Sequence, residues 1–189
     1  MTAISLDLRP LTQKLTHEQF YELCMANRDV AMERSPVGTL IIMSPVGGES
    51  GEKEADYIAD LVIWNRQTRL GKVFSSSTIF KLPNGGDRSP DTAWVSLERW
   101  NELNQAQQKK FPPLCPDFVV ELRSETDRLK SLQDKMQEYL NSGLRLGWLI
   151  NPQDQQIEIY RPDQSVEVID LPAKVSGDKV LPGFVLDVC

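Results

Sequence analysis

Two acidic residues, Asp91 and Glu121, stand at positions in this sequence where carboxylates could do chemistry. Asp91 follows Pro90 at the start of an expected strand, and Glu121 lies near the end of the apolar run 117–122. Burying a carboxylate is costly unless a partner compensates it. Two acids converging there could be stabilised by Mg²⁺ or Mn²⁺, which take hard oxygen ligands. We therefore predict Asp91 and Glu121 as metal ligands.

A site of this kind suits phosphodiester hydrolysis. The metal stabilises the charge that develops on the phosphate and lowers the pKa of an attacking water, and a nearby cation orients that water or neutralises the phosphate. Alternate residues of a strand share a face, so Arg123 is expected to project beside Glu121. Arg123 can contact phosphate, but it is a poor proton acceptor because it stays protonated.

Lys135, on the next expected helix, is a second candidate cation. It lies at the border of an apolar stripe formed by Leu129, Leu132, Met136 and Leu140. A lysine at this border could lean over the end of the sheet, or it could extend to solvent along the apolar surface. The spacing is compatible with either arrangement.

Simpler structural roles exist for both acids. Asp91, directly after a proline, could accept the hydrogen bonds of a turn. Glu121 could be a buried acid that pairs only with Arg123. Both roles stay open as alternatives at the level of the sequence.

Length and charge limit the class of protein. The chain has 189 residues and a net charge of −6, which fits one domain at 16–189 after a loose N-terminal leader at 1–15. An acidic chain is unusual for a strong non-specific DNA binder, although a carboxylate-rich metal site is itself negative. No apolar run is long enough for a membrane span and no signal-peptide core is present, so we expect a cytoplasmic protein.

Several other sites are excluded by residue types. The widely spaced Cys24, Cys115 and Cys189 are expected to be reduced thiols, and His17 is the only histidine, so a zinc site lacks ligands. His17 is expected to be an exposed polar residue of the first helix. The chain lacks the histidine base and the turn glycines that a serine hydrolase needs. The glycine-rich stretch 47–54 lacks the Gly-Lys-Ser/Thr ending of a phosphate-binding loop.

Hydrophobic periodicity indicates how the candidate residues are positioned. Strands that surround a few helices, without strict alternation, predict an α/β (α+β) fold with a mixed sheet flanked by helices. Four helices are expected. The first begins at a Thr16 capping box, the second spans 49–69 with an apolar stripe from Ala55 to Val62, the third occupies part of 97–113 and the fourth spans 127–142. The expected strands form a hairpin at 30–43 and cover 72–76, 78–82, 90–96, 117–122, 145–150, 156–161, 166–170 and 183–188.

Six short stretches, in this order, resemble the Uma-type restriction endonuclease family, a former domain of unknown function that is abundant in cyanobacteria. The resemblance runs from about residue 16 to the end of the chain. The stretches are Arg28-Asp29-Val30-Ala31-Met32-Glu33, Leu40-Ile41-Ile42-Met43-Ser44-Pro45, Ser89-Pro90-Asp91-Thr92-Ala93-Trp94-Val95, Pro116-Asp117-Phe118-Val119-Val120-Glu121, Lys135-Met136-Gln137-Glu138-Tyr139 and Gly147-Trp148-Leu149-Ile150-Asn151-Pro152.

The resemblance implies a restriction-endonuclease-like fold of the PD-(D/E)XK superfamily, with an N-terminal helix and hairpin and extra C-terminal strands. It implies a site of Glu33, Asp91, Glu121 and Lys135, with the catalytic lysine moved to the helix from the position of Arg123. Arg123 then becomes an accessory phosphate contact or a structural ion-pair partner. Glu33 is introduced by the resemblance alone and could instead be a solvent-facing hairpin residue.

Three hypotheses for function follow. The first is an endodeoxyribonuclease that uses Mg²⁺ or Mn²⁺ and acts on DNA, plausibly as a homodimer, because cutting both strands needs two active sites. The second is a nuclease-fold protein without turnover that binds nucleic acid or a protein; the acidic charge and the missing Glu-x-Lys lysine favour it. The third is a metal-dependent hydrolase of another substrate.

Overall fold

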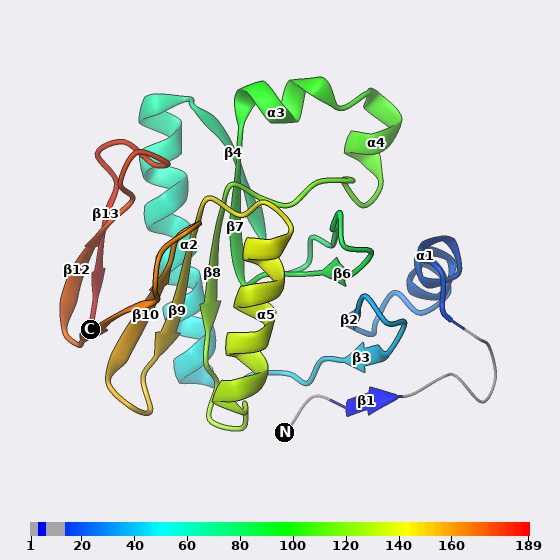
Figure 1. The fold of residues 1–189 in the computed structure, drawn as a ribbon, viewed down its shortest axis with the longest axis horizontal. Coiled ribbons are helices and arrows are strands. Elements are labelled where there is room, and N and C mark those ends of the chain that lie inside the picture. The colour runs from blue at the N-terminus through cyan, green and yellow to red at the C-terminus, as the bar shows by residue number, and fades with distance from the viewer. Residues whose placement is uncertain (1–3, 7–13) are drawn as a thin grey trace.

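A six-stranded mixed sheet forms the centre of the computed structural model, which describes residues 4–6 and 14–189 (Figure 1). Its strand order is β11-β10-β9-β8-β7-β4. The pair β8–β9 is parallel, and α5 connects these two strands, while the other pairs are antiparallel. The elements of this layer are β4 Gly71–Ser75, β7 Thr92–Ser96, β8 Phe118–Leu122, β9 Leu146–Asn151, β10 Gln156–Tyr160, β11 Glu167–Asp170, α2 Gly48–Thr68 and α5 Leu129–Asn141.

Helices α2 and α5 lie on opposite faces of this sheet (Figure 1). Side chains of β8 alternate between the two faces, as in any strand. Phe118 and Val120 belong to the apolar cluster that contains Leu61 of α2, whereas Val119 belongs to the cluster that contains Met136 of α5. Glu121, two residues after Val119, is therefore directed towards α5.

A second, smaller sheet lies beside the first, with strand order β1-β3-β2-β6-β5. Helix α1 packs near it and begins at the predicted capping box, in which Thr16 Oγ1 accepts the Gln19 N–H at 3.2 Å and Gln19 Oε1 accepts the Thr16 N–H at 3.0 Å. The elements of this part are β1 Ile4–Leu6, α1 His17–Ala26, β2 Met32–Arg34, β3 Leu40–Ile42, β5 Phe80–Lys81 and β6 Asp87–Arg88.

Most of the predicted leader, residues 1–15, lies outside the described residues. Of its described residues, Ile4–Leu6 pairs with β3 in antiparallel register. Leu15 is buried in an apolar cluster with Phe20 and Met32. These two parts of the segment thus contact the domain.

The observed elements follow the predicted order, with several differences, among them the short strands β1 and β6, which we did not predict. In α2 the buried residues are Tyr57, Leu61 and Trp64, whereas the predicted stripe member Ala55 is exposed, because the two large aromatic side chains occupy the interface with the sheet. The C-terminal strand pairs with a strand that we did not predict. The remaining elements are α3 Leu97–Glu102, α4 Gln105–Lys109, β12 Ala173–Ser176 and β13 Val185–Val188.

The three cysteines are free thiols, as predicted, with Cys24 and Cys115 buried and Cys189 exposed. Burial raises the pKa of Cys24 to about 11 and that of Cys115 to about 12. Among the described residues, no helix combines the length and the apolar content that crossing a bilayer requires.

Candidate active site

The register between β7 and β8 brings Asp91 beside Glu121. Thr92 pairs with Val120 in this antiparallel ladder. One position beyond this pair, Asp91, which precedes Thr92, lies opposite Glu121, which follows Val120. The Leu122 N–H donates to Asp91 Oδ2 at 2.7 Å. This bond holds the Asp91 carboxylate against the end of β8, between the two strands.

Glu121 receives its hydrogen bonds from α5. It is 2% exposed, and it accepts Lys135 Nζ and the Tyr139 hydroxyl, each at 2.9 Å. Lys135 and Tyr139 are four residues apart and so lie on one face of the helix. Lys135 is itself buried, which favours the inward orientation over the extended one.

Glu33 lies on β2 of the smaller sheet and contacts the same lysine. Its Oε1 lies 2.9 Å from Lys135 Nζ and accepts the Ser89 N–H at 2.9 Å, while its Oε2 accepts Arg88 Nη1 at 2.9 Å. Glu33 is 2% exposed, so the alternative of a solvent-facing hairpin residue is wrong. The lysine ammonium is therefore shared by Glu33 and Glu121.

Arg123 directs its side-chain contacts to the end of β9 and the residues that follow it. Strand β8 ends at Leu122, and the Arg123 N–H donates to the Ile150 carbonyl of β9 at 2.9 Å. Its guanidinium donates to Asn151 Oδ1 at 3.1 Å, Asp154 Oδ2 at 2.9 Å and the Asp127 carbonyl at 3.2 Å. These contacts fit the structural ion-pair role, and contact with phosphate stays a prediction.

The surroundings shift the pKa values of the three acids of the site in different directions. Burial, followed by the charge of Glu121, raises the pKa of Asp91 well above its ordinary value. Burial also raises the pKa of Glu121, although Lys135 opposes it. Burial would raise the pKa of Glu33 too, but Lys135 and Arg88 outweigh burial and lower it. Burial would lower the pKa of Lys135, but the acids outweigh it and raise the pKa.

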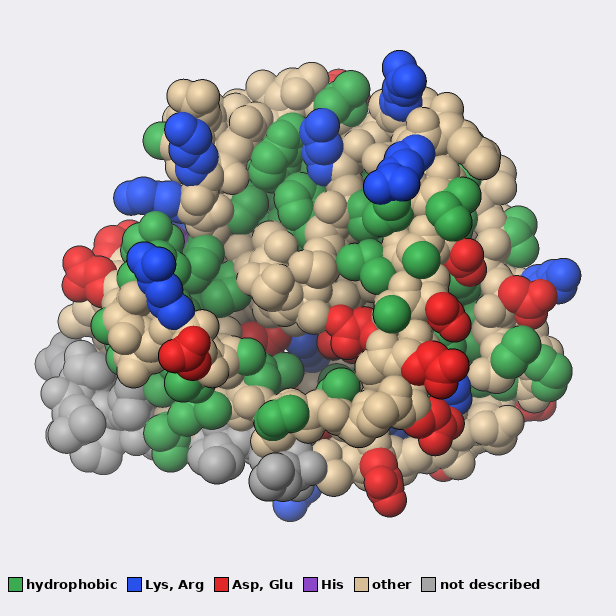
Figure 2. Space-filling model, turned by 180° about the vertical axis from the view of Figure 1, so that it is seen from behind, with side chains coloured by type: hydrophobic (Ala, Val, Ile, Leu, Met, Phe, Trp, Pro, Cys, Tyr) green, Lys and Arg blue, Asp and Glu red, His purple; other side chains and the backbone are tan. Residues whose placement is uncertain are grey.

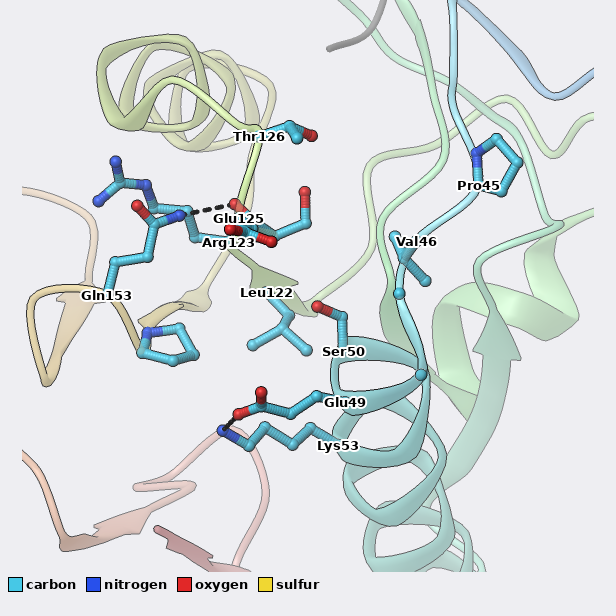
Figure 3. Close-up of a pocket in the computed structure, with 14 residues that line it drawn as sticks. Pro45, Val46, Glu49, Ser50, Lys53, Leu122, Arg123, Glu125, Thr126 and Gln153 are labelled. Atoms are coloured by element: carbon cyan, nitrogen blue, oxygen red, sulfur yellow. Dashed lines mark hydrogen bonds and ion pairs between the residues drawn. The ribbon is translucent and has the colours of Figure 1, made fainter. Parts of the chain in front are cut away.

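A small cavity of about 80 Å³ adjoins these side chains, and its lining includes Asp91, Glu121, Lys135 and Glu54 of α2. A larger cavity of about 550 Å³ shares part of this lining, including Ser50. Figure 3 shows the larger cavity between the first turns of α2 and the segment that follows β8. Figure 2 shows a hollow in the middle of the opposite face of the molecule from Figure 1, with acidic side chains beside it.

Asp91 and Glu121 fit a hard cation that takes few ligands from the protein. The hydrogen bond from Leu122 engages Asp91 Oδ2, and the carboxylate lines the small cavity, where an ion could reach it. The part of the chain that the structure describes holds no group of three or more His, Cys, Asp or Glu residues arranged as a metal site. Mg²⁺ is often bound by one or two carboxylates, with water and substrate phosphate completing its shell.

Two residues of this network, Tyr139 and Arg88, were not predicted from the sequence. The spacing of Tyr139, four residues after Lys135, could have placed it on the same helix face. Arg88 carries no such signal, because its partners Glu33 and Glu138 lie 55 and 50 residues away in the chain.

Comparison with known proteins identifies the fold and the family. The crystal structure of "a putative nuclease belonging to DUF820" from Anabaena variabilis ATCC 29413 matches with a TM-score of 0.73 and 20% identity, over 84% of this chain and 87% of that chain. The fold is therefore restriction-endonuclease-like. The Uma2 family model, described as "Putative restriction endonuclease", matches residues 17–189. The chain belongs to this family. The comparison with curated proteins found no match.

Proposed function

We propose that this protein is a metal-dependent endonuclease that hydrolyses DNA phosphodiester bonds, with a PD-(D/E)XK-type site whose lysine comes from α5. The observation that carries the proposal is the convergence of Asp91, Glu121 and Lys135 at one cavity, from the residue before β7, from β8 and from α5. Family membership and the fold of the DUF820 nuclease support the same activity.

Each side chain has a separate role in the proposed reaction. Asp91 and Glu121 hold Mg²⁺ or Mn²⁺, which when bound supplies charge stabilisation at the phosphate and acidifies a coordinated water. Lys135 stays protonated, because the acids raise its pKa, and so it orients water or neutralises the phosphate rather than accepting a proton. Glu33 holds the ammonium of Lys135 from the side of the smaller sheet.

The acidic net charge is compatible with this function. A chain of charge −6 offers little general attraction for the DNA backbone. A divalent ion at the carboxylates reverses the sign of the local charge, and a substrate phosphate can supply a ligand that the protein does not. The proposed site therefore depends on metal for binding DNA as well as for hydrolysis.

Calorimetric titration with Mn²⁺ tests the ligands. We expect binding by the wild type, and loss of most affinity in Asp91→Asn and Glu121→Gln. Asp154→Asn is the matched control, because Asp154 pairs with Arg123 and does not line the small cavity. Equal affinity in all four proteins would contradict the assignment.

Substrate comparison separates the nuclease from the other two hypotheses. Wild-type protein with Mn²⁺ should cleave DNA, with RNA and a phosphodiester of a small alcohol as comparison substrates. Cleavage only of a comparison substrate would favour a different hydrolase. Metal binding without cleavage of any of them would favour a binding protein with a nuclease fold.

A further inference from the structure

Arg88, on β6, connects the smaller sheet to α5 behind the candidate site. Its Nη1 donates to Glu33 Oε2 at 2.9 Å, while Nε and Nη2 donate to Glu138 Oε2 at 3.1 and 2.5 Å. Arg88 is 8% exposed, and charge-assisted bonds of a buried guanidinium are strong and directional. Arg88 is absent from the lining of the small cavity and from that of a neighbouring cavity of about 520 Å³ that Asp91 also lines, so it is set back from both.

Glu33 is the link between Arg88 and the lysine. One Glu33 oxygen contacts Lys135 and the other contacts Arg88. Lys135 lies between two acids, Glu33 and Glu121, which compete for its ammonium. Because Arg88 compensates part of the charge of Glu33, the lysine can be shared between the acids instead of being drawn wholly to Glu33.

The neighbouring backbone fixes the same arrangement. Ser89, directly after Arg88, donates its N–H to Glu33 and accepts Lys135 Nζ at 3.4 Å through its carbonyl. Glu138 lies three residues after Lys135, on the adjacent turn of α5. Arg88 thus contacts both the acid that holds the lysine and the helix that carries it.

We propose that Arg88 is a positioning residue for the proposed nuclease reaction, acting through Glu33 to hold Lys135 beside Glu121 at the cavity. The inference rests on the proposed function. Residues that orient the groups around a metal site typically contribute 10- to 100-fold to activity or metal affinity, and we expect a loss of about this size in kcat when Arg88 is removed.

A double-mutant cycle in DNA cleavage tests this route. Arg88→Gln should lower kcat, with a much smaller change in KM. The same substitution in a Glu33→Gln background should cause no further loss, because the residue through which Arg88 acts is already neutral. A wild-type kcat in Arg88→Gln, or an equal loss in both backgrounds, would overturn the inference.

One further variant and one comparison within the cycle guard against a purely structural effect. Glu138→Gln is the matched control, since its amide oxygen still accepts from Arg88 and Glu33 keeps both cations; its loss of kcat should be much smaller. If Arg88→Gln does not fold, the comparison of Glu33→Gln/Arg88→Gln with Glu33→Gln still decides the point, because the double variant leaves fewer unpaired buried charges. A lower kcat in the double variant would overturn the inference.

A readout independent of cleavage is the NMR signal of the Lys135 ammonium in ¹⁵N-lysine-labelled protein, assigned by its loss in Lys135→Met. Arg88→Gln should shift this signal more than Glu138→Gln does. If wild-type protein does not cleave DNA but the signal shifts, the proposed function fails and the positioning role stands. An unchanged signal in Arg88→Gln would reject the positioning role whether or not DNA is cleaved.

Discussion

Asp91 and Glu33 belong to one network, yet their surroundings move their pKa values in opposite directions. Asp91 is disfavoured as an anion by burial and by the charge of Glu121. Glu33 is favoured as an anion because Lys135 and Arg88 outweigh the effect of burial. The two acids should therefore have opposite effects on stability in metal-free protein.

Asp91→Asn should stabilise the metal-free protein at neutral pH. The folded-state pKa of Asp91 is raised, so folding favours its protonated form, and the wild type loses stability as pH rises from the ordinary carboxyl pKa through the raised one. The variant lacks this loss, and each kcal/mol gained raises Tm by about 2–4 °C. Thermal unfolding with chelator at pH 5 and pH 8 measures the difference, which should be larger at pH 8. Lower stability of the variant at pH 8 would contradict the electrostatics described above.

Glu33→Gln should destabilise the protein at neutral pH. Lys135 still pairs with Glu121 and Arg88 still pairs with Glu138, so the cost should be about 2 kcal/mol, as for one buried group left partly unsatisfied. Because the folded-state pKa of Glu33 is lowered, its contribution is present above the ordinary glutamate pKa and is lost as pH falls through the lower value. Urea unfolding at pH 7 and at acidic pH measures both. Equal loss at the two pH values would contradict the assignment.

The residues of the site differ in how far the sequence could predict them. Asp91 and Glu121 followed from their positions in strands. For Lys135, the edge of the apolar stripe left two orientations open, over the end of the sheet or out to solvent. Glu33 came only from the resemblance, because its contact with Lys135 joins the smaller sheet to α5, and no local pattern connects these two elements. For Arg123, strand alternation predicted a position beside Glu121, but it could not predict the contacts with Asn151 and Asp154, which lie 28 and 31 residues away in the chain.

At the scale of the elements, periodicity predicted the order of the central-sheet strands and of α2 and α5, but not β6, which carries Arg88. It failed where burial is irregular: β12 buries only Val175 fully, too little to produce an alternating pattern. In α2 the spacing predicted Leu61 correctly but missed Tyr57 and Trp64, since aromatic residues reach the sheet from the margin of the stripe.

A pair of glycine substitutions tests the packing of the central sheet. At Gly71, the first residue of β4, an added Cβ would lie 2.3 Å from the Val95 carbonyl oxygen and 2.4 Å from Trp94 Cε2. Backbone cannot move aside cheaply, so Gly71→Ala should cost about 1–3 kcal/mol. Gly48→Ala, with no atom within 4 Å of the added Cβ, is the control and should be neutral or slightly stabilising. Equal stabilities of the two variants would contradict this packing.

At the scale of the whole molecule, the candidate site lies where the two sheets meet α5. The central sheet carries Asp91 and Glu121, and the smaller sheet carries Glu33 and Arg88. Lys135 joins them through its two ion pairs. The smaller sheet is thus part of the proposed chemistry and more than a cover for the core.

The homodimer expected from the need to cut both strands has consequences that can be measured. Two sites acting together would convert circular plasmid to linear DNA with little nicked intermediate, whereas a single site would nick first. Sedimentation velocity at the assay concentration should give the mass of two 21.4 kDa chains. A monomer that accumulates nicked plasmid would contradict the dimer and leave the site assignment intact.

The central claim is that Asp91, Glu121 and Lys135 carry out metal-dependent DNA hydrolysis. Its most direct test is the single-turnover rate of Mn²⁺-dependent cleavage, measured for wild type, Asp91→Asn, Glu121→Gln, Lys135→Met and the control Asp154→Asn, purified identically. We predict cleavage by the wild type and Asp154→Asn that chelator abolishes, and a loss of at least about 100-fold in the three site variants, comparable to removal of a group that stabilises the transition state. Equal cleavage by the wild type and the site variants would contradict the account.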